Sequence, residues 1–349
     1  MIEIRPIKEK EIDSALSLLL YEKNDDAAQL TQKVESFRRL ARQDSYDLAQ
    51  QIVVIDQGNI EYTCFFATQG SHTAFIYSSP VDVSDSRIYH YSLQALNRLC
   101  QWAIEQNCNL LEVLLDTNDA ARTTFFIDGG FRKLTDLAYL SYPVSPGQQK
   151  HPLEPNIKWL TYEQKYHELF KKVIKETYQG SLDCPELENL RDMEEIILSH
   201  KSAGVFNPRW WKLLLYESSD KPNPNAYNRS LNPAGVLLLS PLRNIESMEL
   251  VYMGLTPGAR GRGLGHILLQ EALSCTQQCG LRQIMLAVDC RNNHASELYM
   301  KYGFTPLLHR SVLYYSTRWQ VVMPSTTARI VEKPQPKVVP TPRPYQPHS

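Results

Sequence analysis

The chain has 349 residues, enough for two domains, and its 37 basic and 38 acidic residues leave a net charge of −1. A hydrophobic content of 43% and a charged content of 21% are typical of globular proteins, and the charge balance gives no reason to expect nucleic acid or membrane as a partner. No signal-peptide hydrophobic region and no apolar run long enough to span a bilayer is seen, so we expect a cytoplasmic protein.

The first half of the chain predicts a mixed α/β module. A short strand at residues 2–5 precedes helical sequence from Glu9 to about Gln43. Strands are predicted at 51–56, 62–68 and 73–78, followed by a helix with one apolar stripe (Leu93, Leu96, Cys100, Ala103). A further strand at 110–115 and a Gly130-Phe131 pair complete this half.

The second half repeats the same order of elements, which indicates an internal duplication. A strand at 157–161 precedes helical sequence from Tyr162 to about Lys201. Three strands are predicted next, at 211–216, 234–239 and 248–255, with a long polar loop at 217–232. A helix (Leu264, Leu268, Ala272 and Cys275 on one face), a buried strand at 284–288 and a Gly303-Phe304 pair follow.

A glycine-rich turn precedes the helix of the second half, and it reads Arg260-Gly261-Arg262-Gly263-Leu264-Gly265. Glycines permit positive φ and leave no Cβ between the backbone amides and a ligand. The first N–H groups of a helix lack intrahelical partners, so this turn with its two arginines is suited to a pyrophosphate. Its spacing differs from the kinase-type phosphate loop and from the Gly-x-Gly-x-x-Gly of dinucleotide-binding folds.

Two motifs resemble those of the GCN5-related N-acetyltransferase (GNAT) superfamily. The family's phosphate motif, Arg/Gln-x-x-Gly-x-Gly/Ala, matches Arg260, Gly263 and Gly265. Its second motif, Asn-x-x-Ala-x-x-x-Tyr with Gly-Phe four residues later, is matched in order and spacing (Asn292, Ala295, Tyr299, Gly303, Phe304). The duplication is similar to the tandem arrangement of mycothiol synthase and related two-module enzymes.

The resemblance implies an α/β (α+β) fold of two tandem acetyltransferase-fold modules, each a mixed, mostly antiparallel twisted sheet flanked by helices. It implies an N-acetyltransferase that moves an acetyl group from acetyl-CoA to an amine on a small molecule or peptide, by direct attack in a ternary complex and without a metal. The pantetheine arm is expected along the backbone of Met253 and Leu255, as an added strand would lie. The remaining cofactor contacts are expected at the phosphate turn and the second motif (Arg260, Gly261, Arg262, Gly263, Leu264, Gly265, Asn292).

Two side chains are candidates for proton transfer. The family position matched by Tyr299 commonly protonates the coenzyme A thiolate, and a phenol with a pKa near 10 is protonated at neutral pH. Glu249 matches a general base used by some members, and strand alternation predicts that it shares a face with Val251 and Met253. A packed aromatic and a glutamate paired with a surface cation are the structural alternatives. The segment 178–185 is a candidate for acceptor contact, or else a proline-terminated helix connection.

The first copy differs where chemistry would occur. Its turn, Pro80 to Arg87, has no glycine and two acidic residues, and only Phe125 and Phe126 stand where the second copy has Tyr299. We therefore predict a degenerate N-terminal module (1–142), a linker (143–156), a catalytic C-terminal module (157–322) and a disordered Pro-rich tail (323–349). A remodelled N-terminal pocket for another ligand stays open.

The alternative function is a non-catalytic acetyl-CoA-binding or scaffold protein. A nucleotide-binding α/β protein is disfavoured, because the glycine turn lies far into the chain rather than in a first βα unit. The sequence predicts neither the identity of the acceptor nor the oligomeric state.

Overall fold

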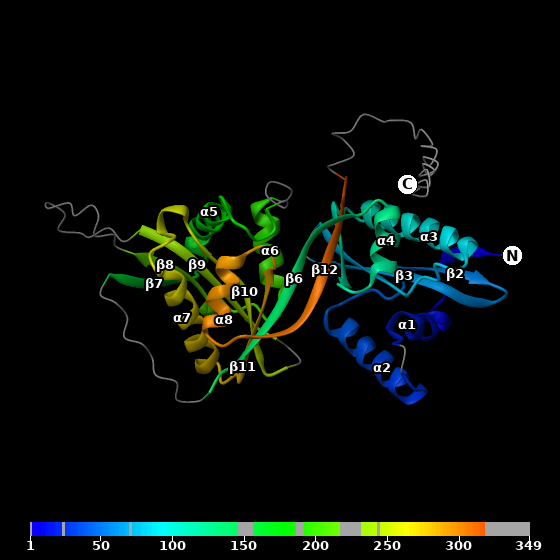
Figure 1. Cartoon of the computed structure of the whole chain (residues 1–349), viewed down its shortest axis with the longest axis horizontal. Helices are drawn as coiled ribbons and strands as arrows, with labels where there is room; N and C mark the ends of the chain where they lie inside the picture. Colours follow the sequence, from blue (N-terminus) through cyan, green and yellow to red (C-terminus); the bar gives the residue numbers. More distant parts are fainter. Residues whose placement is uncertain are drawn as a thin grey trace, which may run out of the picture.

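A computed structural model describes residues 2–22, 25–69, 72–145, 156–185, 192–216, 232–242 and 245–317. Their strands form one 12-stranded sheet in the order β1-β2-β3-β4-β5-β12-β6-β11-β10-β9-β8-β7 (Figure 1). The strands are β1 (Glu3–Pro6), β2 (Gln51–Asp56), β3 (Asn59–Gln69), β4 (Thr73–Ser78), β5 (Leu110–Asp116), β6 (Arg132–Pro143), β7 (Ile157–Thr161), β8 (Trp211–Tyr216), β9 (Asn232–Pro241), β10 (Ser247–Leu255), β11 (Gln283–Asp289) and β12 (Thr305–Ser316).

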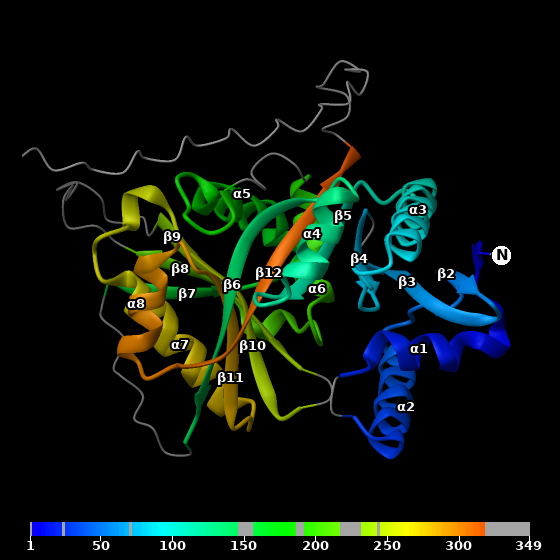
Figure 2. The same ribbon diagram turned by 45° about the vertical axis from the view of Figure 1, so that its right-hand side comes forward.

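Helices flank both faces of this sheet (Figures 1 and 2). They are α1 (Ile12–Leu20), α2 (Ala27–Gln43), α3 (Ser86–Glu105), α4 (Ala120–Asp128), α5 (His167–Tyr178), α6 (Met193–Ser202), α7 (Leu264–Gln278) and α8 (Asn293–Lys301). The sequence predicted one helical segment from Glu9 to about Gln43 and another from Tyr162 to about Lys201. Each of them is two helices in the structure, α1 and α2 in the first half and α5 and α6 in the second. Among the described residues, no helix combines the length and apolar composition needed to cross a bilayer.

The last strands of the two halves are exchanged. β6, from the N-terminal half, pairs antiparallel with β11 of the C-terminal half, whereas β12 pairs antiparallel with β5 of the N-terminal half. β6 and β12 pair with each other, and Figure 2 shows these long strands side by side between the two lobes. One continuous sheet results, in which each half completes the other's part of the sheet. The division of the sequence into modules that end at residue 142 and begin at residue 157 remains a proposal.

The two halves are related by an approximate two-fold axis between β6 and β12. Gly130 and Gly303 have φ values of +90° and +91°, and a Cβ on either would meet a tyrosine ring at 3.5 Å. Leu137 and Arg310, equally far beyond these glycines, pair with each other. Because equivalent residues pair only on such an axis, the strand exchange is symmetric.

The core of the C-terminal half has two layers. The predicted apolar face of α7 is confirmed, because Leu264, Leu268, Ala272 and Cys275 are all buried. This face packs on one side of the sheet, together with α8 residues and the Leu237, Leu239 and Leu286 side chains. α5 packs on the opposite side through Phe170, Val173 and Ile174. The hydrophobic residues of β8, β9 and β10 therefore lie in both layers, whereas Ile284, Leu286 and Val288 of β11 pack only on the α7 side.

The mixed, mostly antiparallel α/β fold predicted from the sequence is confirmed. The described strand pairs are antiparallel except β4 with β5 and β10 with β11. The polar loop at 217–231, most of the linker (146–155) and the tail from residue 318 lie outside the described residues.

Candidate active site

β10 and β11 separate in the middle of the C-terminal half. Their parallel pairing extends only from Ser247–Glu249 against Gln283–Met285 among the described residues. Beyond this point β10 stays with β9, while β11 stays with β6. Thr256 donates its N–H to the Ala234 carbonyl on β9, so the alternating residues Met253 and Leu255 direct their backbone groups to the side from which β11 has departed.

A bulge in β10 changes which side chains share a face with Glu249. The pairing with β9 runs from Leu250↔Leu239 to Tyr252↔Leu238, so one residue is inserted between them. The expectation that Glu249 shares a face with Met253 is therefore wrong, because an inserted residue inverts the alternation beyond it. Glu249 instead shares the α5-facing side with Tyr252, whose hydroxyl lies 2.9 Å from Thr177 Oγ1.

The glycine turn exposes its backbone. Gly261 and Gly263 have φ values of +74° and +77°, and a Cβ on either would meet nothing within 4 Å. Gly263 is the N-cap of α7, and the first backbone bond of this helix runs from His266 N to the Gly263 carbonyl. The amides of Gly263, Leu264 and Gly265 therefore have no partner within the helix, and no side chain caps them.

The two arginines of the turn donate hydrogen bonds to backbone carbonyl oxygens. Arg260 donates to three carbonyl oxygens, those of Leu255 at 3.2 Å, Gly180 at 3.1 Å and Thr177 at 2.9 Å. Arg262 donates from Nε to the Gly258 carbonyl. The guanidinium of Arg260 thereby ties the turn to the C-terminal end of α5. The anion-binding capacity of the turn thus comes chiefly from backbone amides and the helix dipole.

Tyr299 lies on α8 in a buried setting. Its ring packs on Phe304 with centroids 5.6 Å apart, and 5% of the residue is exposed. Burial raises the pKa of Tyr299 well above 10, and the Asp183 carboxylate raises it further. The phenol is therefore protonated across the physiological range. Asn292 caps the same helix by accepting from Ala295 N through Oδ1 at 3.2 Å.

Glu249 is a half-buried carboxylate. Burial raises the pKa of Glu249 above its ordinary value of 4.5. A carboxyl group whose pKa is raised accepts a proton more readily at neutral pH than an exposed one. Its structural alternative, pairing with a surface cation, finds no support among the described residues, where no salt bridge of Glu249 occurs.

The segment 178–185 contributes residues that the sequence motifs did not single out. Asp289 N donates to Asp183 Oδ1 at 3.2 Å, and Cys184 N donates to Asp289 Oδ2 at 3.1 Å. Burial raises the pKa of Asp183. Burial opposes ionisation of Asp289 too, but bonds from Arg291 lower its pKa to about 2. The one sequence signal was the position of Asp289 at the end of a buried strand.

In the N-terminal half, other side chains stand at the positions equivalent to Gly263, Tyr299 and Glu249. Asp85 caps α3 by accepting from Arg87 N at 2.9 Å and Ile88 N at 3.1 Å, where α7 has only Gly263. Phe126 packs on Phe131 with centroids 5.1 Å apart, in the place of Tyr299 on Phe304. Phe75 stands in the strand position of Glu249, since each is the last residue in its parallel pairing.

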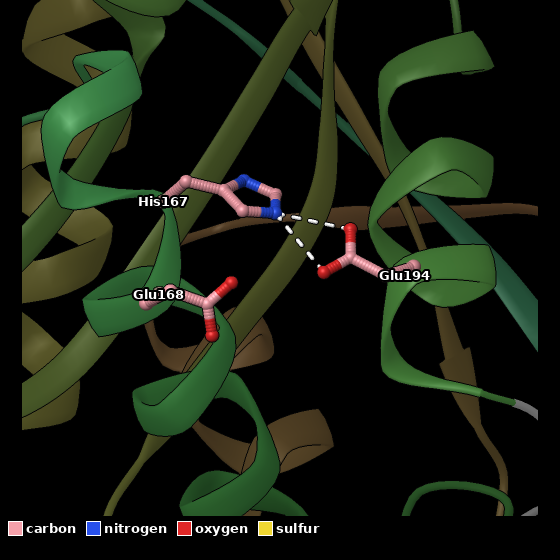
Figure 3. A group of neighbouring side chains, drawn as sticks. All are labelled: His167, Glu168 and Glu194. Carbon is pink, nitrogen blue, oxygen red and sulfur yellow. Dashed lines mark hydrogen bonds and ion pairs between the residues drawn. The ribbon is translucent and has the colours of Figure 1, made fainter.

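Another group of polar side chains joins α5 to α6 (Figure 3). His167 Nε2 lies 3.0 Å from Glu194 Oε2, and its Nδ1 lies 2.9 Å from the Tyr162 hydroxyl. Lys171 Nζ donates to Glu194 at 2.6 Å and to Glu168 at 3.5 Å. The carboxylates thus face a lysine within hydrogen-bonding distance, and the arrangement fits an ion-pair network that braces two helices.

Comparison with known proteins agrees with this geometry. The family model described as Acetyltransferase (GNAT) family matches residues 190–304, which include β10, the glycine turn, α7, β11 and α8. The segment from residue 190 to residue 304 is therefore similar to the GNAT family. A GCN5-related N-acetyltransferase from Sphaerobacter thermophilus is similar over 90% of this chain and 95% of that one, with a TM-score of 0.57 and 14% identity, which supports the shared fold.

Two named relatives are mycothiol acetyltransferases. That of Beutenbergia cavernae is 41% identical over 59 residues, which are 17% of this chain and 20% of the relative. That of Jonesia denitrificans is 22% identical over 135 residues, which are 36% of this chain and 43% of the relative. The matches span less than half of either relative, so the acceptor named for them is not carried over to this chain by similarity alone.

Proposed function

We propose that the C-terminal half is an acetyl-CoA-dependent N-acetyltransferase that acts on an amine by direct attack in a ternary complex. The observation that carries the proposal is the combination of a parted strand pair with an uncapped, glycine-lined helix N-terminus. β10 offers the backbone of Met253 and Leu255 at the parting, and the amides of residues 260 to 265 lie at its end. An extended arm that ends in a pyrophosphate matches both features.

Acetyl-CoA would supply an activated acetyl group as a thioester. Transfer to an amine requires that one proton leave the nitrogen and that one proton reach the departing sulfur. Glu249 is proposed as the acceptor of the first proton, directly or through water, because its raised pKa favours protonation. Tyr299 is proposed as the donor of the second, because its phenol stays protonated.

The remaining cofactor residues have more limited proposed roles. Arg260 and Arg262 are proposed to shape the turn through the carbonyls that they hold. Asn292 positions α8, and therefore Tyr299, by capping that helix. The chemistry needs no metal. The N-terminal half is proposed to be a degenerate partner, because Asp85 already satisfies the amides that would receive a phosphate.

Acetyl transfer to a panel of primary amines, read by mass spectrometry of the acetylated product, tests this function. The panel should include the acceptor of the mycothiol acetyltransferases, because these are named relatives. The matched control is a Glu249→Gln/Tyr299→Phe double variant, which should keep its calorimetric affinity for coenzyme A and lose turnover. Tight acetyl-CoA binding with no acetylated amine in the panel would favour the non-catalytic alternative.

A further inference from the structure

The sheet face that carries Glu249 is uncovered beside the parting of β10 and β11. Ala287 lies in β11, an interior strand of the 12-stranded sheet, and yet it is exposed. It faces the same side as Glu249, because Glu249 pairs with Met285, two residues earlier in the strand. Tyr139 pairs with Ala287, and Leu308 pairs with Tyr139. We call Ala287, Tyr139 and Leu308 the open floor.

The N-terminal half contributes one of the three residues of the open floor. Tyr139 belongs to β6, which reaches β11 only because the last strands of the two halves are exchanged. Burial raises the pKa of Tyr139, the Glu249 and Glu112 carboxylates raise it further, and the Arg310 guanidinium, which Asp116 holds at 2.9 Å, lowers it. The floor therefore begins beside the proposed proton acceptor and extends across the junction of the two halves.

The far end of the floor is apolar and exposed. Leu308 is 39% exposed, and Leu307, the extra residue of a bulge opposite Leu140 and Tyr139, is 49% exposed. Exposed apolar side chains that adjoin one another on a strand form a surface that an apolar group can cover.

The equivalent surface of the N-terminal half is already covered. Leu134 is the extra residue of the matching bulge in β6, and it is 6% exposed. It packs in one cluster with Val312 and Tyr314, against which Cys184 of the segment after α5 also packs. The same segment that holds Asp183 near Tyr299 thus closes one of the two symmetric surfaces. Only the surface beside Glu249 stays open among the described residues.

We propose that the open floor binds the body of the acceptor, and that the acceptor is a primary amine with an apolar rather than a polar body. The proposal rests on the proposed function, since it assumes that the amine nitrogen lies at Glu249. Ala287 would set the space available above the floor, and Tyr139 would be a specificity residue contributed by the N-terminal half.

Two amines of equal heavy-atom count test the proposal: n-hexylamine and 2-(2-aminoethoxy)ethanol. Calorimetric titration of each into the coenzyme A-saturated full chain should give an affinity about tenfold or more higher for hexylamine. Ala287→Asp should lower the hexylamine affinity about tenfold or more, because it places a charge on the floor, and leave coenzyme A affinity unchanged. Ala121→Asp, at an exposed alanine of α4, is the matched control and should change neither.

A second variant, Leu308→Asn, protects the test against misfolding of Ala287→Asp, because Leu308 is already exposed. It should also weaken hexylamine selectively. Equal affinity for the two amines, or hexylamine binding that both floor variants leave unchanged, would overturn the proposal. Hexylamine that binds the floor without being acetylated would support the floor while contradicting the proposed enzyme, so the two failures are distinguishable.

Discussion

Tyr299 and Phe126 occupy equivalent positions in the two halves. Each lies four residues before a glycine with φ near +90°, and each ring packs on the phenylalanine that follows this glycine. The pairs differ by one oxygen atom, the phenol hydroxyl. α4 of the N-terminal half therefore has the same ring packing as α8 but lacks the phenol. This contrast separates the packing role of Tyr299 from its proposed chemical role.

Tyr299→Phe should lower turnover by roughly 10²- to 10⁴-fold while leaving acetyl-CoA affinity nearly unchanged. The ring contact with Phe304 survives the change, and the hydroxyl has no hydrogen bond within the described part of the chain. Pre-steady-state acetyl transfer and calorimetric binding check the two expectations. Tyr142→Phe is the control, because Tyr142 also stacks on Phe304 at 5.3 Å. Unchanged turnover where chemistry limits the rate would return Tyr299 to a packing role.

Gly263→Asp should abolish measurable acetyl-CoA binding, because its carboxylate would cap α7 as Asp85 caps α3. The substitution also strains a residue at φ +77°, at a cost of about 1–2 kcal/mol. Gly58→Asp is a matched control for this strain, since Gly58 has φ +88° and nothing within 4 Å of an added Cβ. Both variants should lose similar stability in urea unfolding. Retained binding in Gly263→Asp would contradict the pyrophosphate assignment.

Glu249 predicts the acidic limb of the pH–rate profile. A base must be deprotonated, so kcat/KM should rise as pH rises through a pKa above the ordinary 4.5. Glu249→Gln should lower the rate and remove this limb. A limb that persists in Glu249→Gln would assign the titration to another group.

The Glu249 carboxyl makes stability depend on pH in the opposite sense to a carboxylate whose pKa is lowered by an ion pair. The folded state binds its proton more tightly than the unfolded state, because burial raises its pKa. Its contribution to stability is therefore present below pH 4.5 and is lost as pH rises through the folded pKa. Urea unfolding at several pH values should find Glu249→Gln gaining stability relative to the parent chain across this window.

Arg260→Lys tests whether this side chain braces the turn or binds the phosphates. Lysine keeps the charge but lacks the planar fork that reaches the Leu255, Gly180 and Thr177 carbonyls together. We expect a loss of about 1 kcal/mol or more in stability, faster amide exchange after α5 and weaker acetyl-CoA binding. Arg262→Lys, at a residue that holds the Gly258 carbonyl, should have the smaller effect. Full acetyl-CoA affinity in Arg260→Lys would favour a simple charge role.

Local pattern predicted much of this fold. The strands at 73–78 and 110–115, the apolar face of α7 and the glycine turn all lie where periodicity and turn residues indicated. These features follow from interactions between residues close in sequence, namely which side chains share a face and where φ must be positive. The motif spacing also singled out Tyr299 as a candidate, because its distance from Asn292 is set by one helix.

Tertiary structure decided the features that join distant segments. Nothing in the local pattern of β6 specifies that it pairs with β11 rather than within its own half, because antiparallel pairing is compatible with any strand of matching apolar alternation. The face of Glu249 depended on one inserted residue in β10. The orientation of Arg260 depended on carbonyls at the end of α5, and the position of Asp183 depended on Asp289. Each of these contacts exists only once the sheet has brought separate parts of the chain together.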